Sequence, residues 1–184
     1  MIRQVLTELN SRMEKVVDGL GKDLAVIRTG RATPALVEKI MVNYHGALTP
    51  LLQLASVSTP ETNLILIQPW DRTALKEIEK AILKGINLNP QNDGNVIRVM
   101  IPPLSEERRV ELAKLVSKRV EERRVMLRNI RRDGIEELRQ MEKNKEISQD
   151  QLKSASKEVD ELSSSFIDKI NEIGQNKERE IKEV

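Results

Sequence analysis

Residues 105–145 carry hydrophobic side chains at helical spacing, and this segment most constrains what the chain can fold into. Apolar side chains recur at steps built from three and four residues, at Leu112, Val116, Val120, Leu127, Ile130, Leu138 and Met141. That spacing predicts one amphipathic helix, which at 1.5 Å per residue would be about 60 Å long. Pro102-Pro103, a Ser105 N-cap and acidic residues in the first turn mark its start. We therefore expect an elongated molecule, with Gly134 as the one weak point of this helix.

Two further segments have the same periodicity. One stripe runs through Leu6, Leu9, Met13, Val16, Leu20, Leu24 and Ile27, and predicts a helix that stops near Gly30. The other follows a reversal at 146–148, where Ser148 and Gln151 have the spacing of a capping box. Its stripe is Leu152, Ala155, Val159, Leu162, Phe166, Ile170, Ile173 and Ile181. The short connection predicts antiparallel neighbours, and hence an antiparallel three-helix bundle built from 1–30 and 105–184.

Residues 31–104 have a different pattern. Alternating apolar residues precede a His45-Gly46 turn, and the runs 64–67 and 96–100 are typical of strands. Between them, Asp71 can cap a helix that Gly85 closes. The segment is therefore predicted to be a small β/α/β domain inserted into the bundle, and the whole chain to be of the α+β class.

The insertion leaves and re-enters the bundle through two short segments, which together form a two-strand joint. The first contains Thr29, Gly30 and Arg31, and the second contains Pro103, Leu104 and Ser105. A flexible glycine combined with restricting prolines suits a hinge with a preferred axis. An ordinary domain boundary without functional motion is the alternative interpretation.

The composition excludes several kinds of chemistry. The chain has one histidine and no cysteine, so neither a zinc cluster nor thiolate catalysis can be built. It also lacks a phosphate-binding glycine loop, a nucleophile elbow and an apolar run long enough for a membrane. Its first residues alternate charged and apolar types, so we expect no signal peptide. We expect a cytoplasmic protein without catalytic residues, metal or cofactor. Its three aromatic residues are too few to stack on the bases of a nucleic acid.

Positive charge is concentrated in one segment. Residues 105–132 contain ten Lys or Arg against five Asp or Glu, whereas 133–184 contain nine against fourteen. Helical geometry brings Arg124, Arg128, Arg131 and Arg132 to one ridge beside the apolar stripe. Because guanidinium groups match phosphate oxygens bidentately, this ridge predicts binding to a polyanion, with RNA as the leading candidate.

Two alternatives remain open from the residues alone. The arginines can pair with glutamates of the other two helices and lay their stems over the bundle. The apolar stripes can also belong to a coiled-coil adaptor that binds a partner protein. A hydrolytic enzyme is a third reading, and it would need a metal or nucleotide site.

Several strings resemble the bacterial ribosome recycling factor family across essentially the whole chain. They are Ile27-Arg28-Thr29-Gly30-Arg31-Ala32, Gln53-Leu54-Ala55-Ser56-Val57, the segment from Pro102-Pro103-Leu104-Ser105 to Arg109, the segment 125–133, and Lys145-Glu146-Ile147-Ser148. One departure is His45, where the family usually has a second tyrosine.

The resemblance implies a monomeric factor that binds the post-termination ribosome. With elongation factor G and GTP it would split the ribosome into subunits and release mRNA and tRNA. The bundle would lie on large-subunit ribosomal RNA through Arg28, Arg31, Arg128, Arg131 and Arg132, to which the charge pattern adds Arg124. Gly30, Leu104 and Ser105 would lie at the hinge.

Overall fold

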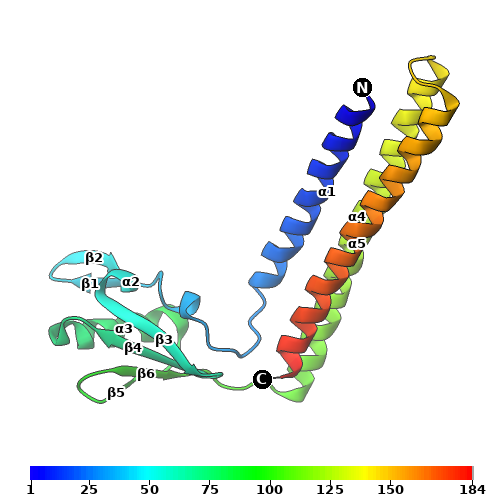
Figure 1. Cartoon of the computed structure of the whole chain (residues 1–184). Coiled ribbons are helices and arrows are strands. Elements are labelled where there is room, and N and C mark those ends of the chain that lie inside the picture. The colour runs from blue at the N-terminus through cyan, green and yellow to red at the C-terminus, as the bar shows by residue number, and fades with distance from the viewer. Residues whose placement is uncertain (184) are drawn as a thin grey trace. The chain divides into compact units, whose positions relative to one another are not determined.

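The computed structural model describes residues 1–183. In chain order, its elements are α1 (Ile2–Ala25), η1 (Pro34–Leu36), β1 (Met41–Tyr44), β2 (Ala47–Pro50), α2 (Leu51–Leu54), β3 (Ala55–Glu61), β4 (Leu64–Pro69), η2 (Arg72–Ala74), α3 (Leu75–Ile86), β5 (Gln91–Asn92), β6 (Ile97–Met100), α4 (Glu106–Lys143) and α5 (Gln149–Lys182). The chain forms two compact units, Met1–Arg28 with Glu106–Glu183, and Thr29–Ser105. Long helices and a small sheet unit together confirm the α+β class (Figure 1).

The first unit is a bundle of α1, α4 and α5, which all pack against one another. The apolar stripes of the three helices form its core. In α4 the buried residues are Leu112, Val116, Val120, Leu127, Ile130, Gly134 and Leu138. In α1 the buried stripe begins at Val5, which lies about one turn before Leu9 on the same face, and the predicted Leu6 is half-buried. In α5, small Ser163 and Gly174 occupy buried positions beside half-buried Leu162 and Ile173.

The ends of the bundle helices have local causes. Helix α1 ends at Ala25, earlier than the predicted Gly30, because the chain tightens there: Ile27 N donates to Leu24 O at 3.1 Å. The capping box of α5 is confirmed, with Gln151 N donating to Ser148 Oγ at 3.2 Å and Ser148 N to Gln151 Oε1 at 2.8 Å. These bonds satisfy backbone donors that the helix itself cannot pair.

Three glycines inside the bundle helices allow close packing. A Cβ on Gly134 would collide with the side chain of Leu9, so this glycine is a point of contact between α4 and α1, and α4 runs through it without interruption. A Cβ on Gly174 would lie 2.6 Å from Val120 Cγ2. At Gly19 the neighbour is the guanidinium of Arg123. The prediction of a weak point at Gly134 considered helix propensity alone and missed the contact.

The second unit contains more strands than the predicted β/α/β pattern. Strands β3, β4, β6 and β5 form an antiparallel sheet in that order, and β1 pairs with β2 in a separate hairpin. The hairpin turn has positive φ at His45 (49°) and Gly46 (85°), which two-residue hairpin turns of the primed type require. Strand β3 was not predicted, because only Ala55 and Val57 alternate as apolar residues and its last four positions are exposed.

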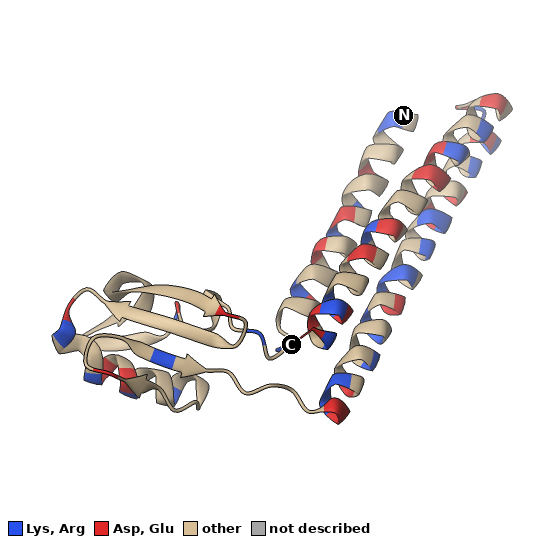
Figure 2. Ribbon diagram, turned by 60° about the horizontal axis from the view of Figure 1, so that its bottom comes forward, with Lys and Arg blue, Asp and Glu red and all other residues tan. Residues whose placement is uncertain are grey.

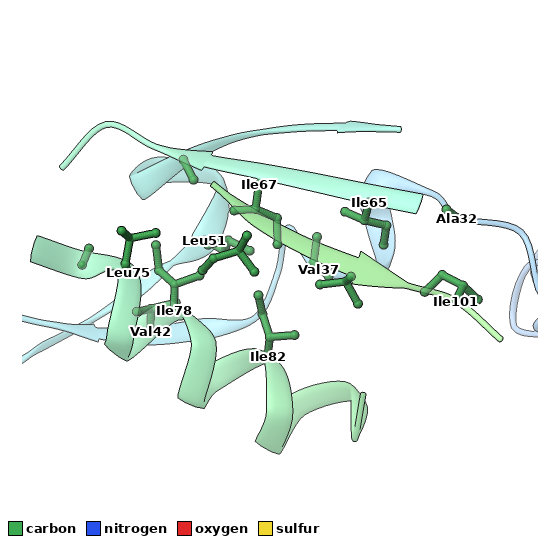
Figure 3. Packing of buried hydrophobic residues seen from close by; sticks show 14 residues of the cluster. Ala32, Val37, Val42, Leu51, Ile65, Ile67, Leu75, Ile78, Ile82 and Ile101 are labelled. Carbon is green, nitrogen blue, oxygen red and sulfur yellow. The ribbon is translucent and has the colours of Figure 1, made fainter. Parts of the chain in front are cut away.

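The core of the second unit lies where α3 meets the sheet and the hairpin. Ile65 and Ile67 of β4 join Ile78 and Ile82 of α3 in one buried cluster (Figure 3). The helix does not close at Gly85 as predicted. It continues to Ile86 and ends at Asn87, whose φ of 55° is left-handed, and Gly85 instead accommodates the side chain of Ile40.

Both ends of the inserted segment are attached to the β3–β4 turn. Ala32 N donates to Thr62 O, and Ile101 N donates to Asn63 O, each at 2.8 Å. Since Thr62 and Asn63 are neighbours, the chain enters and leaves this unit at the same corner of the sheet. The segments 26–31 and 102–105 therefore lie outside the hydrogen-bonded body of the unit.

Candidate nucleic-acid interface

One arginine of the basic segment 105–132, Arg123, is part of the interior of the bundle. The buried stripe of α4 skips from Val120 to Leu127, and Arg123 occupies the helical position between them. Its side chain is 19% exposed, and its Nη2 lies 2.5 Å from Asp23 Oδ2 on α1. Hydrogen bonding to Arg123 lowers the pKa of Asp23. Arg123 is therefore part of the α1–α4 packing, and the seven-residue gap in the stripe is the sequence signal for it.

Two arginines of the predicted ridge share one carboxylate. Arg124 Nη1 lies 3.1 Å from Glu121 Oε2, and Arg128 Nη2 lies 2.5 Å from Glu121 Oε1. These hydrogen bonds, from Arg124 and Arg128 in that order, lower the pKa of Glu121. Arg124 also reaches α5, where its Nε and Nη2 donate to Asn171 Oδ1 at 2.8 and 2.5 Å.

The other two ridge arginines differ in their contacts. Arg131 Nε donates to Asp160 Oδ1 of α5 at 2.6 Å, and the two side chains are 46% and 49% exposed. Arg132 is exposed and has no hydrogen bond or ion pair with any residue in the described range 1–183. Surface ion pairs of this kind stabilise a fold by about 0–1 kcal/mol, so fold stability alone does not account for the cluster.

The charges of the bundle are mixed along its helices, as Figure 2 shows for α4. Upstream of the ridge, Arg119 pairs with Glu122 at 3.2 Å, and Arg109 Nη1 donates to the carbonyl of Lys182 at 3.0 Å. The arginines therefore differ in whether protein groups occupy their N–H donors. Arg123 and Arg131 do pair across the bundle, but with aspartates of α1 and α5 and not with the predicted glutamates. Arg124 reaches Asn171 of α5, whereas Arg132 faces solvent.

The remaining predicted RNA-binding residues lie at the bundle's first crossing segment. Arg28 is the last residue of the first bundle segment, and Arg31 belongs to the second unit. Both are exposed, and neither has a polar partner among the residues that the structure describes.

The predicted hinge residues lie in chain without helix or strand. Thr29 is 7% exposed, and Gly30 has a φ of 75°, which favours glycine. On the return crossing, Pro103 and Ser105 are exposed and Leu104 is half-buried.

No helix within residues 1–183 is long and apolar enough to cross a membrane. Over the same range, no group of His, Cys, Asp and Glu side chains is arranged to hold a metal ion.

A family model described as Ribosome recycling factor matches residues 20–181. The chain belongs to the ribosome recycling factor family. The ribosome-recycling factors of Bacillus licheniformis and Dehalococcoides mccartyi are 49% and 50% identical to it over 185 residues, covering 100% of both chains in each case. The resemblance predicted from the sequence strings is confirmed.

Two solved structures of the family have the same fold. One, described as the solution structure of the ribosome recycling factor, matches with a TM-score of 0.74 and 44% identity over 100% of this chain and 98% of that one. The other describes models for the T. thermophilus ribosome recycling factor and the E. coli elongation factor G bound to the E. coli post-termination complex. It matches with a TM-score of 0.63 and 41% identity, and covers 98% of each chain. The coiled-coil adaptor is not favoured, because the apolar stripes are buried within this chain's own bundle.

Proposed function

We propose that this protein recycles ribosomes after termination. It binds the post-termination ribosome through large-subunit ribosomal RNA and, with elongation factor G and GTP, splits it into subunits, releasing mRNA and tRNA. The observation that carries the proposal is membership of the ribosome recycling factor family over the full length of close relatives. A neighbouring structure described as the factor with elongation factor G on the post-termination complex supports the choice of partners.

The bundle is the RNA-binding part in this proposal. The RNA-binding face of the bundle contains Arg28, Arg124, Arg128, Arg131 and Arg132, and Arg31 of the second unit is a further RNA-binding residue. The chain has only one Trp, one Tyr and one Phe, so recognition relies on phosphates and on the shape of the RNA, not on stacking with splayed bases. Guanidinium groups on a stiff helix suit this kind of recognition, because their spacing is set before binding.

The second unit is the moving part. Its hydrogen-bonded body ends at Ala32 and Ile101, and this leaves the hinge to Thr29, Gly30, Arg31, Pro103, Leu104 and Ser105. The bundle, built from both of its chain segments, and the inserted unit then act as two separate stiff bodies. The chain itself breaks no covalent bond, and GTP hydrolysis belongs to elongation factor G. We place the protein in the cytoplasm as a monomer that needs no cofactor.

A splitting assay tests this proposal. Post-termination complexes are mixed with elongation factor G and GTP, with and without the protein, and subunit release is followed by light scattering. We expect dissociation to depend on the protein. Equal dissociation without it would refute the function.

A charge reversal tests the RNA-binding face. Arg131→Glu should weaken binding to isolated large subunits by about 10- to 100-fold, because it removes a charge-assisted contact and adds repulsion. Arg119→Glu is the matched control, since it makes the same change on α4 about 120° around the helix. Equal effects of the two variants would mean that net charge, and not this face, governs binding.

A further inference from the structure

The arginines of the proposed RNA-binding face differ in which of their N–H groups remain available. Arg131 uses only Nε, which donates to Asp160 Oδ1 at 2.6 Å. Its Nη1 and Nη2 have no hydrogen-bond partner among residues 1–183. Asp160 therefore binds the Nε side of the guanidinium, while Nη1 and Nη2 can still donate to two oxygens of one phosphate.

Arg124 is arranged in the opposite way. Its Nε and Nη2 donate to Asn171 and its Nη1 to Glu121, so every nitrogen of the guanidinium has a protein partner. At 35%, its side chain is less exposed than those of Arg128 (52%) and Arg131 (46%). Three of its five N–H groups are used and no nitrogen is left without a protein partner, so this arginine links α4 to α5.

Glu121 connects Arg124 to Arg128. Each carboxylate oxygen of Glu121 accepts from one of the two arginines. Arg128 lies about two helical turns beyond Glu121 along α4. Arg128 donates to this carboxylate through Nη2 alone, so Nη1 and Nε remain without a partner in the described chain. Arg124 thus orients Glu121, and Glu121 restrains Arg128.

We propose that Asp160 and Glu121 are positioning residues of the RNA-binding face, that Arg124 is a strut between α4 and α5, and that Arg128, Arg131 and Arg132 grip phosphates. This inference rests on the proposed function. Two effects of each carboxylate oppose one another. Its charge weakens the attraction of the face for phosphate, but ordering an arginine beforehand removes an entropy cost from binding. The proposal states that the second effect is larger.

Two substitutions at Asp160 separate these effects. Asp160→Ala and Asp160→Asn both remove the negative charge, but only asparagine keeps an oxygen that can accept from Arg131 Nε. We expect Asp160→Ala to weaken binding to isolated large subunits by about three- to tenfold, the cost of ordering one long side chain. Asp160→Asn should bind at least as tightly as the parent protein. If charge alone matters, both variants bind more tightly and to the same extent.

Asp168→Ala is the matched control for charge. Asp168 lies on α5, is exposed, and has no polar partner among the described residues. Its removal makes the same change in net charge without releasing an arginine. Binding should stay the same or tighten slightly, and a loss as large as that of Asp160→Ala would overturn the positioning role.

Salt dependence tests the assignment of Arg124. Each phosphate contact contributes about 0.7 to 0.9 to the slope of log affinity against log salt concentration. Arg128→Gln and Arg131→Gln should each reduce the slope by about that amount. Arg124→Gln should lower affinity but leave the slope unchanged, and a slope reduced as in Arg131→Gln would overturn its role as a strut.

The outcomes separate this inference from the proposed function. If neither Arg128→Gln nor Arg131→Gln changes affinity or slope, the RNA-binding face is wrong, and the splitting assay alone decides the function. If both lower the slope but the two Asp160 variants behave alike, only the positioning inference fails. All these side chains are at least one-third exposed, so the variants should fold, and circular dichroism of each checks this.

Discussion

Adding a single methyl group at Gly174 should destabilise the bundle, although the same change normally strengthens a helix. Alanine is favoured over glycine in a helix interior by about 1 kcal/mol. At Gly174, however, the new Cβ would lie 2.6 Å from Val120 Cγ2, well inside van der Waals contact. Val120 is 5% exposed, and a valine in a helix has essentially one side-chain rotamer, so it cannot turn away. The two helices must separate instead.

The expected size of the effect follows from these two opposing terms. Overpacking of a core costs about 1–3 kcal/mol, which leaves Gly174→Ala net destabilised by up to about 2 kcal/mol after the gain in helix propensity. For a chain of this size, that corresponds to a melting temperature lower by up to about 8 °C. Far-UV circular dichroism at 222 nm measures it, because the bundle helices dominate that signal.

Gly21→Ala provides the matched comparison. Gly21 also lies inside a bundle helix, but a Cβ there would meet no atom within 4 Å. This variant should therefore raise the melting temperature by about 2–4 °C. If Gly174→Ala were stabilised as much as Gly21→Ala, close packing of α5 on α4 would be refuted at this position.

Three further changes have expected outcomes. Ser163→Ala should stabilise the bundle by about 1 kcal/mol, because the buried Oγ has no hydrogen-bond partner among the described residues; an unchanged or lower urea midpoint would contradict this. Ser148→Ala should cost about 1 kcal/mol by the same measurement, since it removes the capping box of α5, and a neutral result would count against that cap. The hydrogen bond from Tyr44 lowers the pKa of Asp71, so its contribution to stability is full above the unfolded pKa, near 3.9, and is lost as pH falls through the folded pKa. Tyr44→Phe should therefore lower stability at pH 6 and flatten its decline below about pH 4; an unaltered pH profile of the denaturation midpoint would reject the coupling.

The long helices were predictable because their signal is local. Apolar side chains three and four residues apart face the same way on any helix, so the stripes of α1, α4 and α5 can be read without knowing their partners. The capping box at Ser148 and Gln151 is local for the same reason. Strand β3 was missed because its apolar alternation is limited to Ala55 and Val57 and its last four positions are exposed.

The roles of individual charged residues were less predictable. All the arginines of 105–132 contribute the same charge to a count along the chain, but Arg123 faces inward and Arg132 faces solvent. Arg123 lies in the gap of the apolar stripe, which can be seen in the sequence. Its inward position depends on Gly19 and Asp23 of the neighbouring helix. Whether Arg124 and Arg131 meet Asn171 and Asp160 depends on the register of α5 against α4.

Periodicity and capping therefore determine that this chain makes three long amphipathic helices with an inserted sheet unit, because both depend on residues within a few positions of one another. Packing between helices decides the rest. Gly134 looks like a weak point along the chain and proves to be the place where α1 approaches α4, and the basic ridge divides into bound and free guanidinium groups. Contacts between residues 29 to 125 positions apart depend on helix rotation and register, which only the tertiary structure sets.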